Sequence, residues 1–486
     1  MRSLRTAPAA VSLLVSLALL AAAVLAAPLE PRLAHKHRSL ASAAVSASNV
    51  SDAAMPAGNV SDAALRAVSA KRINARFGRD KLVRGVNLGG WFLLEAWETP
   101  HVFLTSDIER QQLSDEWAWM GAKGARAKPD LVAHYNSYYT EQDFAEMAQA
   151  GLNTVRIPLP FWTFVPTVSP EPYLVNRQRA ALRRALGWSL KHGLDVVLDL
   201  HALPGNINGQ DNGGRLGQQD WAKDPKNLDR SIAALQNMVE LYVNNASYGG
   251  VVKAIQVANE PRINAQLSLP FLGAYHKRAL AAVRNAVSPT ALVRPTTMFS
   301  DAFQDVTKYN YMFPQGDFPP QQLVVDKHFY FVKQWDRSLP DNDEELLRHV
   351  CAIGPRLRKA HAVRPVVVGE FSLGRTTRCV DYHDCKGRTI AHDLPSLNSK
   401  SNNLFMRRFA EAQLATYEQA GGWIMWTWKT DAAAAWSYQA ARNQGWLPSD
   451  VSDPTQRLYT PAPGSATDQR CVSEQPSRAP RFAMQS

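Results

Sequence analysis

Two glutamates, Glu260 and Glu370, each follow a short apolar run of the chain. Two carboxyl groups that face each other can cleave a glycosidic bond, because one protonates the leaving oxygen while the other stabilises or attacks the anomeric carbon. A separation of about 5–5.5 Å gives retention of configuration, and about 6.5–9.5 Å admits a water molecule and gives inversion. We expect Glu260 to be the acid/base and Glu370 the nucleophile of a retaining pair.

Polar side chains end the other apolar runs in the same way, and they are Arg156, Asp199, His201, Asn259, His328, Tyr330, Trp426 and Trp428. Arg156 is expected to pair with Glu370 and keep it ionised, because an unpaired carboxylate is costly to bury. The charge of Glu370 would then raise the pKa of Glu260. Alternatively, either glutamate alone could lie at the start of a surface helix, and His201 and His328 could be core histidines. Trp428 is expected to face a sugar, and Trp426 to pack in the core.

Short β-branched runs alternate with helical stretches from Lys81 onward. The expected strands are 83–88, 153–158, 195–200, 254–259, 296–300, 323–330, 365–371 and 423–428. The expected helices are about 141–150, 176–192, 229–246, 270–287, 343–361 and 403–420. Eight such repeats predict an α/β fold, a (β/α)8 TIM barrel, whose working residues lie at the carboxyl ends of the strands. The first strand lacks a Gly-x-Gly-x-x-Gly turn, which disfavours a dinucleotide-binding fold.

Composition indicates a globular protein, with 486 residues, 45% of them hydrophobic and 20% charged. The formal net charge is +11, but residues 1–72 hold 8 Lys/Arg against 3 Asp/Glu and account for +5 of it. No Lys/Arg-rich run with interleaved aromatics follows, so nucleic acid is not an expected partner.

The N-terminus has the layout of a signal peptide, with Arg2 and Arg5 before an apolar stretch that ends in small residues near Ala27. We expect residues 1–27 to be the signal peptide and 28–72 an Ala/Ser-rich leader or pro-segment, disordered. Residues 73–486 would form a single catalytic domain. A membrane anchor is the alternative for the apolar stretch. Cleavage would leave a secreted protein, extracellular or in the cell wall, without an anchor.

If the protein is exported, its cysteines can form disulfides and its Asn-x-Ser sites can be glycosylated. Asn49, Asn59 and Asn245 are candidate glycosylation sites. Four cysteines allow three disulfide pairings, and we favour Cys379 with Cys385 and Cys351 with Cys471. A zinc site is not expected, because no Cys-x-x-Cys occurs.

Six segments together resemble glycoside hydrolase family five of clan A, and are most similar to its fungal-type exo-1,3-β-glucanase branch. They are Arg84–Glu95, Asn153–Pro158, Asp199–Gly205, Gln256–Pro261, Gly369–Phe371 and Trp423–Lys429, in the family's order over about residues 80–450. The resemblance implies that Glu260 is the acid/base and Glu370 the nucleophile. It also implies sugar-binding roles for Glu95, Arg156, His201, Asn259, His328, Tyr330 and Trp428.

Under this resemblance Arg156 orients Glu370, and Asn259 binds the sugar 2-hydroxyl. His201, His328 and Tyr330 line the subsite of the cleaved sugar, Trp428 underlies that sugar, and Glu95 binds the terminal glucose. The chain departs from the branch at Gln210 and Lys333, which stand where two phenylalanines form an aromatic clamp.

The resemblance implies a β-glucan exo-1,3-β-glucosidase that releases glucose from non-reducing ends, without a metal or other cofactor, and we expect a monomer. A β-1,6-glucanase, a β-glucosidase or a glucan transglycosylase is the alternative within the same chemistry. A wall-binding barrel without activity and a metal-dependent barrel hydrolase are alternatives from other classes.

Overall fold

The computed structural model describes residues 76–105, 113–248, 250–333, 335–375, 400–431 and 434–459. All of them belong to one compact unit of the chain. The eight strands are β1 (Val83–Asn87), β2 (Thr154–Pro160), β3 (Asp195–Ala202), β4 (Val252–Gln256), β5 (Thr296–Ser300), β6 (Leu323–Phe329), β7 (Val366–Phe371) and β8 (Gly422–Met425).

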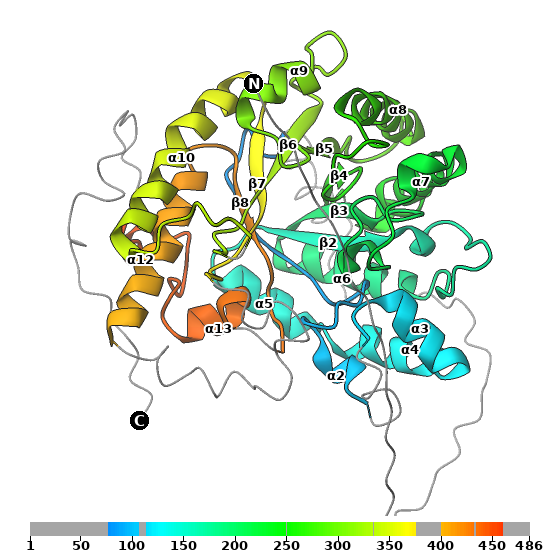
Figure 1. The fold of residues 1–486 in the computed structure, drawn as a ribbon, viewed down its shortest axis with the longest axis horizontal. Coiled ribbons are helices and arrows are strands. Elements are labelled where there is room, and N and C mark those ends of the chain that lie inside the picture. Colours follow the sequence, from blue (N-terminus) through cyan, green and yellow to red (C-terminus); the bar gives the residue numbers. More distant parts are fainter. Residues whose placement is uncertain are drawn as a thin grey trace, which may run out of the picture. The chain divides into compact units, whose positions relative to one another are not determined.

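Each strand pairs in parallel with the next, and β1 pairs with β8, so the sheet closes into a barrel (Figure 1). The (β/α)8 prediction is confirmed, with each predicted strand lying within a few residues of its observed place. Gly422 helps to close the barrel, because its φ is +103° and an added Cβ would lie 2.0 Å from the Val83 carbonyl oxygen. A side chain at this position would separate β8 from β1.

Helices surround the barrel (Figure 1). The six predicted ones are α5 (Glu141–Gln149), α6 (Arg179–His192), α7 (Pro225–Met238), α8 (Leu269–Ala286), α10 (Asp343–Val363) and α12 (Lys400–Tyr417). Within the described ranges, the sequence analysis missed five further helices, α2 (Pro100–Phe103), α3 (Glu116–Lys123), α4 (Ala127–Ser137), α9 (Tyr309–Met312) and α13 (Tyr438–Asn443). Each is too short, or too mixed in its apolar spacing, for a clear helical period.

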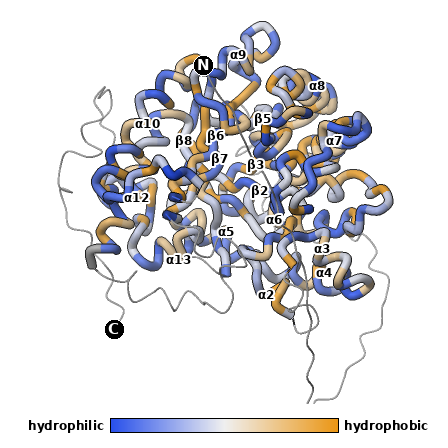
Figure 2. Tube along the Cα trace, in the orientation of Figure 1, coloured by the Kyte–Doolittle hydropathy of each residue, from blue (hydrophilic) through white to orange (hydrophobic). Residues whose placement is uncertain are grey.

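Two apolar layers hold the barrel together. A small cluster fills its interior, with Phe77 packed among Val83, Val197, Met298 and Ile424. A much larger cluster lies between the strands and the surrounding helices. Figure 2 shows apolar stretches along the strands and mixed hydropathy on the helices, as expected when only one helix face is buried.

Several predictions from the sequence concern residues outside the described ranges. The signal peptide, the leader, the boundary at residue 73, Asn49 and Asn59 all lie there, as do Cys379, Cys385 and Cys471. Cys351, in α10, is disulfide-bonded. Asn245 is exposed just after α7 and its π-helical extension, as a glycosylation site requires. Among the described helices, none has both the length and the apolar character to cross a bilayer.

Candidate active site

The two glutamates predicted to work together lie at the same end of the barrel. Glu260 follows β4, and Glu370 is the penultimate residue of β7. One oxygen of each carboxylate and a ring nitrogen of His328 lie within 4.8 Å of one another. Glu260 has a φ of 44°, a left-handed conformation that costs a residue with a side chain about 1–3 kcal/mol. The fold therefore holds this carboxylate in place at the expense of backbone strain.

Arg156 in β2 is the centre of the buried polar network, and its side chain is 0% exposed. Its guanidinium donates to Glu370 Oε1 at 2.8 Å and forms an ion pair with Asp199 at 3.0 Å. Asn87, Gln256 and Asn259 accept its remaining N–H groups at 2.7–2.8 Å. The predicted pairing of Arg156 with Glu370 is thus present, and the guanidinium fixes the carboxylate from one side.

His328 in β6 lies between the two glutamates. Its Nδ1 donates to Glu260 Oε1 at 2.7 Å and lies 3.4 Å from Glu370 Oε2, while its Nε2 donates to Asp326 Oδ2 at 2.8 Å. Burial lowers the pKa of His328, but the nearby charges of Asp326 and Glu370 outweigh burial and raise it well above the ordinary value. His328 is therefore a buried cation among three carboxylates.

A glycine makes this arrangement possible. A Cβ at Gly369 would lie 2.0 Å from Asp326 Oδ1. The register of β6 against β7 also shifts between Lys327 and His328, so that His328 stands opposite Glu370. Because Gly369 has no side chain, the Asp326 carboxylate fits beside it and can hydrogen-bond to His328.

Tyr330, Asn212 and His201 complete the contacts of the pair. The Tyr330 hydroxyl donates to Glu370 Oε2 at 2.7 Å. Asn212 Nδ2 donates to Glu260 Oε2 at 3.3 Å. His201 Nδ1 donates to Asp199 at 2.6 Å, and its Nε2 accepts from Asn259 Nδ2 at 3.1 Å. His201 and His328 both hydrogen-bond within the network around the glutamates, so neither is an ordinary core histidine.

The charge balance of the pair differs from the prediction. Burial raises the pKa of Glu370 above its ordinary value, and the positive charges of His328 and Arg156 only partly oppose it. Burial acts on Glu260 too, but the hydrogen bond and charge of His328 outweigh it, so the pKa of Glu260 lies below its ordinary value. The expectation that Glu260 would have the raised pKa is wrong for this arrangement, because the sequence analysis did not place His328 against it.

Glu260, His328 and Glu370 are also close enough to hold a metal ion. A histidine binds a metal through an unprotonated ring nitrogen. Both ring nitrogens of His328 donate to carboxylates, and its raised pKa favours the protonated ring. These three side chains are therefore better suited to holding a proton on His328 than to binding a metal ion.

The position of Trp428 differs from the prediction, whereas Trp426 is buried in a small aromatic cluster. Trp428 is 0% exposed, and its indole N–H donates to Asp143 Oδ1 at 3.0 Å, away from the glutamates. Trp426 stacks on His201, with ring centroids 5.4 Å apart. The prediction failed because β8 ends at Met425, so the strand alternation on which it relied does not reach these residues.

Glu95 is buried near the glutamate pair. Its Oε2 accepts from the Trp97 indole N–H at 3.0 Å. Burial raises its pKa well above the ordinary value, and the charges of Asp211, Glu370 and Glu260 add to the rise. Trp97 packs with Trp436 and Trp426 in a small aromatic cluster. Glu95 is thus a carboxyl group in a tryptophan-rich wall of the site, as a residue that binds a terminal sugar would be.

The two positions of the missing clamp are polar and accessible. Gln210 is exposed, and Lys333 is half-buried, where it donates to the Leu339 carbonyl oxygen and pairs with Asp341 at 3.2 Å. An aromatic side chain is nevertheless close by. Trp335 is 53% exposed, and its ring packs edge-on against the ring of Tyr330, with the ring centroids 5.6 Å apart.

Sequence reasoning missed four members of the network, namely Asn87, Asn212, Gln256 and Asp326. Strand alternation is a signal that could have found Asp326, which is two residues before His328 in β6 and therefore on the same face. Asn212 lies in a single 3-10 turn, Asp211–Gly213, which is too short to show a periodicity.

Comparison with known proteins agrees with this geometry. The family described as cellulase (glycosyl hydrolase family 5) matches residues 113–430. A probable glucan 1,3-beta-glucosidase A of Aspergillus fumigatus is 33% identical over 397 residues, which cover 78% of this chain and 90% of that protein. The protein of the same name from Aspergillus niger is 34% identical over 407 residues, with the same coverage. Among solved structures, a rutinosidase from Aspergillus niger has a TM-score of 0.61 at 20% identity, covers 76% of this chain and 99% of its own, and shows a shared fold.

Proposed function

The chain belongs to glycosyl hydrolase family 5 and is a glycoside hydrolase, and from this premise we propose that it is a glucan 1,3-β-glucosidase that removes glucose from chain ends. The observation that carries the proposal is the Glu260–Glu370 pair, held by Arg156, His328 and Tyr330 at a spacing of at most 4.8 Å. Relatives named glucan 1,3-beta-glucosidase, about one-third identical over most of the chain, support the substrate.

In the proposed first step, Glu370 attacks the anomeric carbon while Glu260 protonates the leaving oxygen. The contact with Arg156 at 2.8 Å and the Tyr330 hydroxyl at 2.7 Å orient the two oxygens of Glu370. A spacing this short supports a retaining pair, in which the second carboxylate attacks the sugar directly and forms a covalent glycosyl intermediate. Glu260 then removes a proton from the water that releases the sugar.

The acid must hold a proton that Glu260, with its lowered pKa, does not keep by itself. We assign His328 as the source. The Nδ1 proton can pass over 2.7 Å to Glu260 Oε1, which leaves a neutral imidazole still bonded to Asp326 through its Nε2–H. The proton then goes to the leaving oxygen. In the second step the attacking water gives a proton to Glu260, which returns it to His328 Nδ1 and restores the starting state.

Substrate contacts are proposed for the residues around the pair. Asn259 is held between Arg156 and His201 and would bind the 2-hydroxyl of the cleaved sugar. Trp426 rather than Trp428 would underlie that sugar. Glu95, whose pKa burial raises well above its ordinary value, would bind hydroxyls of the terminal glucose and make the enzyme act from the chain end.

We also propose that the protein is exported, after removal of residues 1–27 and with residues 28–72 as a leader or pro-segment. The signal-peptide layout at the N-terminus supports this. So does Asn245, an exposed Asn-x-Ser acceptor. We propose the pairings Cys351–Cys471 and Cys379–Cys385, to be checked by peptide mapping without reduction.

Product analysis tests the function. A β-1,3-glucan labelled at its reducing end is digested, and the products are followed by chromatography and by proton NMR of the anomeric signals. The proposal expects glucose as the first product, released as the β-anomer, with the label remaining on the shortened polymer. Early oligosaccharides, the α-anomer, or faster release from a β-1,6-glucan would each contradict it. Glu260→Gln and Glu370→Gln are the inactive controls.

A further inference from the structure

A second cavity lies on another side of the loop that contacts Glu260. Residues 203–224, between β3 and α7, form one wall of this cavity of about 400 Å³, and it is called here the loop pocket. None of its lining residues belongs to the glutamate network. Its volume lies in the range of small-molecule sites, about 300–1,000 Å³.

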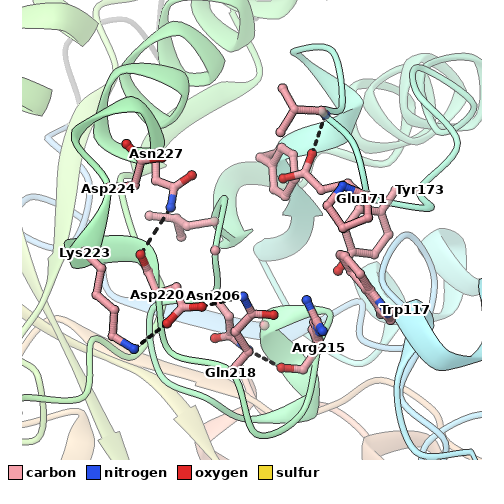
Figure 3. Close-up of a pocket in the computed structure, with 16 residues that line it drawn as sticks. Trp117, Glu171, Tyr173, Asn206, Arg215, Gln218, Asp220, Lys223, Asp224 and Asn227 are labelled. Carbon is pink, nitrogen blue, oxygen red and sulfur yellow. Dashed lines mark hydrogen bonds and ion pairs between the residues drawn. The ribbon is translucent and has the colours of Figure 1, made fainter.

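One wall of the loop pocket is aromatic. Trp117 and Tyr173 lie on one side of the opening, together with Glu171 (Figure 3). Tyr173 is fixed by stacking on Trp162 at 3.6 Å and by donating to the Gly214 carbonyl oxygen at 3.0 Å. Phe161 completes this wall. A rigid aromatic wall can pack against the apolar face of a ligand with little loss of entropy.

The opposite wall is polar. Asn206, Gln218 and Asp220 lie together in Figure 3. Gln218 Nε2 donates to Asp220 Oδ2 at 2.5 Å, which sets the orientation of the amide. Gln218 Oε1 is then a buried acceptor without a hydrogen-bond partner among the described residues. A buried acceptor without a donor is unfavourable, so the Gln218 amide would gain by turning toward a ligand hydroxyl in the cavity.

The charges around the loop pocket are balanced. Asp220 pairs with Lys223 at 2.5 Å, and Glu171 pairs with Arg230 at 2.7 Å. The guanidinium of Arg215 lies over the Trp117 ring, 3.9 Å from its centroid. An aromatic face beside amide side chains and two neutralised carboxylates suits a neutral ligand with many hydroxyls better than an ion.

We propose that the loop pocket is a second, non-catalytic binding site for a neutral oligosaccharide, a short β-linked glucose chain. The identity of the sugar rests on the proposed function. The same loop serves both sites. Asn206 Nδ2 donates to the carbonyl oxygens of Gln210 and Arg215, and Asn212 reaches Glu260. A bound chain would keep the polymer near the enzyme between cleavage events.

Calorimetric titration with a β-1,3-linked glucose trisaccharide tests the proposal, using the full chain with Glu370→Gln so that the sugar is not consumed. Two binding sites per chain are expected. Adding Gln218→Ala and Asp220→Ala should weaken the second site at least tenfold and leave the first unchanged. Gln236→Ala and Asp229→Ala, both exposed on α7 outside the pocket, are the matched controls.

Val168→Trp is a second variant that keeps the hydrogen bonds of the loop. Val168 is 53% exposed at the pocket, so a large side chain there would block the opening. In otherwise wild-type enzyme, this variant should raise the KM for long β-1,3-glucan several-fold and leave aryl β-glucoside hydrolysis unchanged. One binding site in the Glu370→Gln protein, or two sites that survive both variants, would overturn the proposal. Glucan hydrolysis measured in the same preparation tests the proposed function separately.

Discussion

Among single residues, His328 has the largest role in setting the pKa values of the two glutamates. Among the described residues it is the cation that contacts both glutamates, and it opposes the effect of burial on the pKa of each. Catalysis needs Glu370 ionised and a proton available to Glu260. In this account both requirements depend on one imidazole that Asp326 holds in place.

We therefore predict that His328→Gln moves the acidic limb of the pH profile. Without the cation, burial raises the pKa of Glu370 further, so the nucleophile ionises only at a higher pH. The acidic limb of kcat/KM should shift upward by about one pH unit, with a lower maximum. The measurement is aryl β-glucoside hydrolysis from pH 3 to 9. His276→Gln, at another buried histidine, is the control, and an unmoved limb in His328→Gln would refute the assignment.

The two tryptophans after β8 give a second prediction. Trp426→Ala should lower kcat/KM at least tenfold, because the ring beside His201 would support the sugar. Trp428→Phe should cost about 1 kcal/mol of stability by removing the hydrogen bond to Asp143, with little effect on KM. Kinetics and thermal unfolding of both variants check this. The reverse pattern would restore Trp428 as the sugar-facing residue.

At the scale of elements, the meeting of β6 and β7 positions the nucleophile. Gly369 allows Asp326 to approach, and the shifted register brings His328 opposite Glu370. Gly369→Ala is predicted to displace Asp326 and His328 and to lower kcat by about 100-fold, the cost of a misplacement near 1 Å. Gly187→Ala in α6 is the control, because its Cβ would meet nothing within 4 Å. Equal activity of the two variants would show that this packing does not matter.

The sequence was sufficient for the eight strands, because a buried parallel strand is a short apolar run bounded by polar residues. It was also sufficient to place Glu260 and Glu370 at the carboxyl ends of their strands, whereas Arg156 lies inside β2 and not at its end. It did not reveal the His328–Glu260 contact, since His328 is in β6 and Glu260 follows β4, two strands that are not neighbours in the barrel. The orientation of Trp426 and Trp428 depends on where β8 ends, which no periodicity marks.

At the scale of the whole molecule, the barrel buries carboxyl groups outside the catalytic pair. Glu116, the first residue of α3, is 0% exposed and accepts from the Leu94 backbone N–H at 3.0 Å. Burial raises its pKa to about 8. The folded protein therefore holds this proton more tightly than the unfolded chain, whose glutamates titrate near pH 4.5.

This difference predicts how stability depends on pH. The contribution of Glu116 is complete below about pH 4.5 and is lost as the pH rises to about 8. Glu116→Gln removes the titration. As the pH rises from 5 to 9, the free energy of unfolding of the variant should therefore increase by roughly 1–3 kcal/mol relative to that of the parent. Thermal unfolding of both proteins across this range is the test. A constant difference would show that Glu116 does not titrate in this window.

The central claim is that Glu370 is the nucleophile of a retaining glycoside hydrolase. A 2-deoxy-2-fluoroglucoside with a good leaving group slows release of the glycosyl intermediate, so the sugar stays attached for peptide mapping by mass spectrometry. We predict one fluoroglucosyl group per chain, on the peptide that contains Glu370, and none in Glu370→Gln. Labelling at Glu260, or turnover of the reagent without any covalent intermediate, would contradict it.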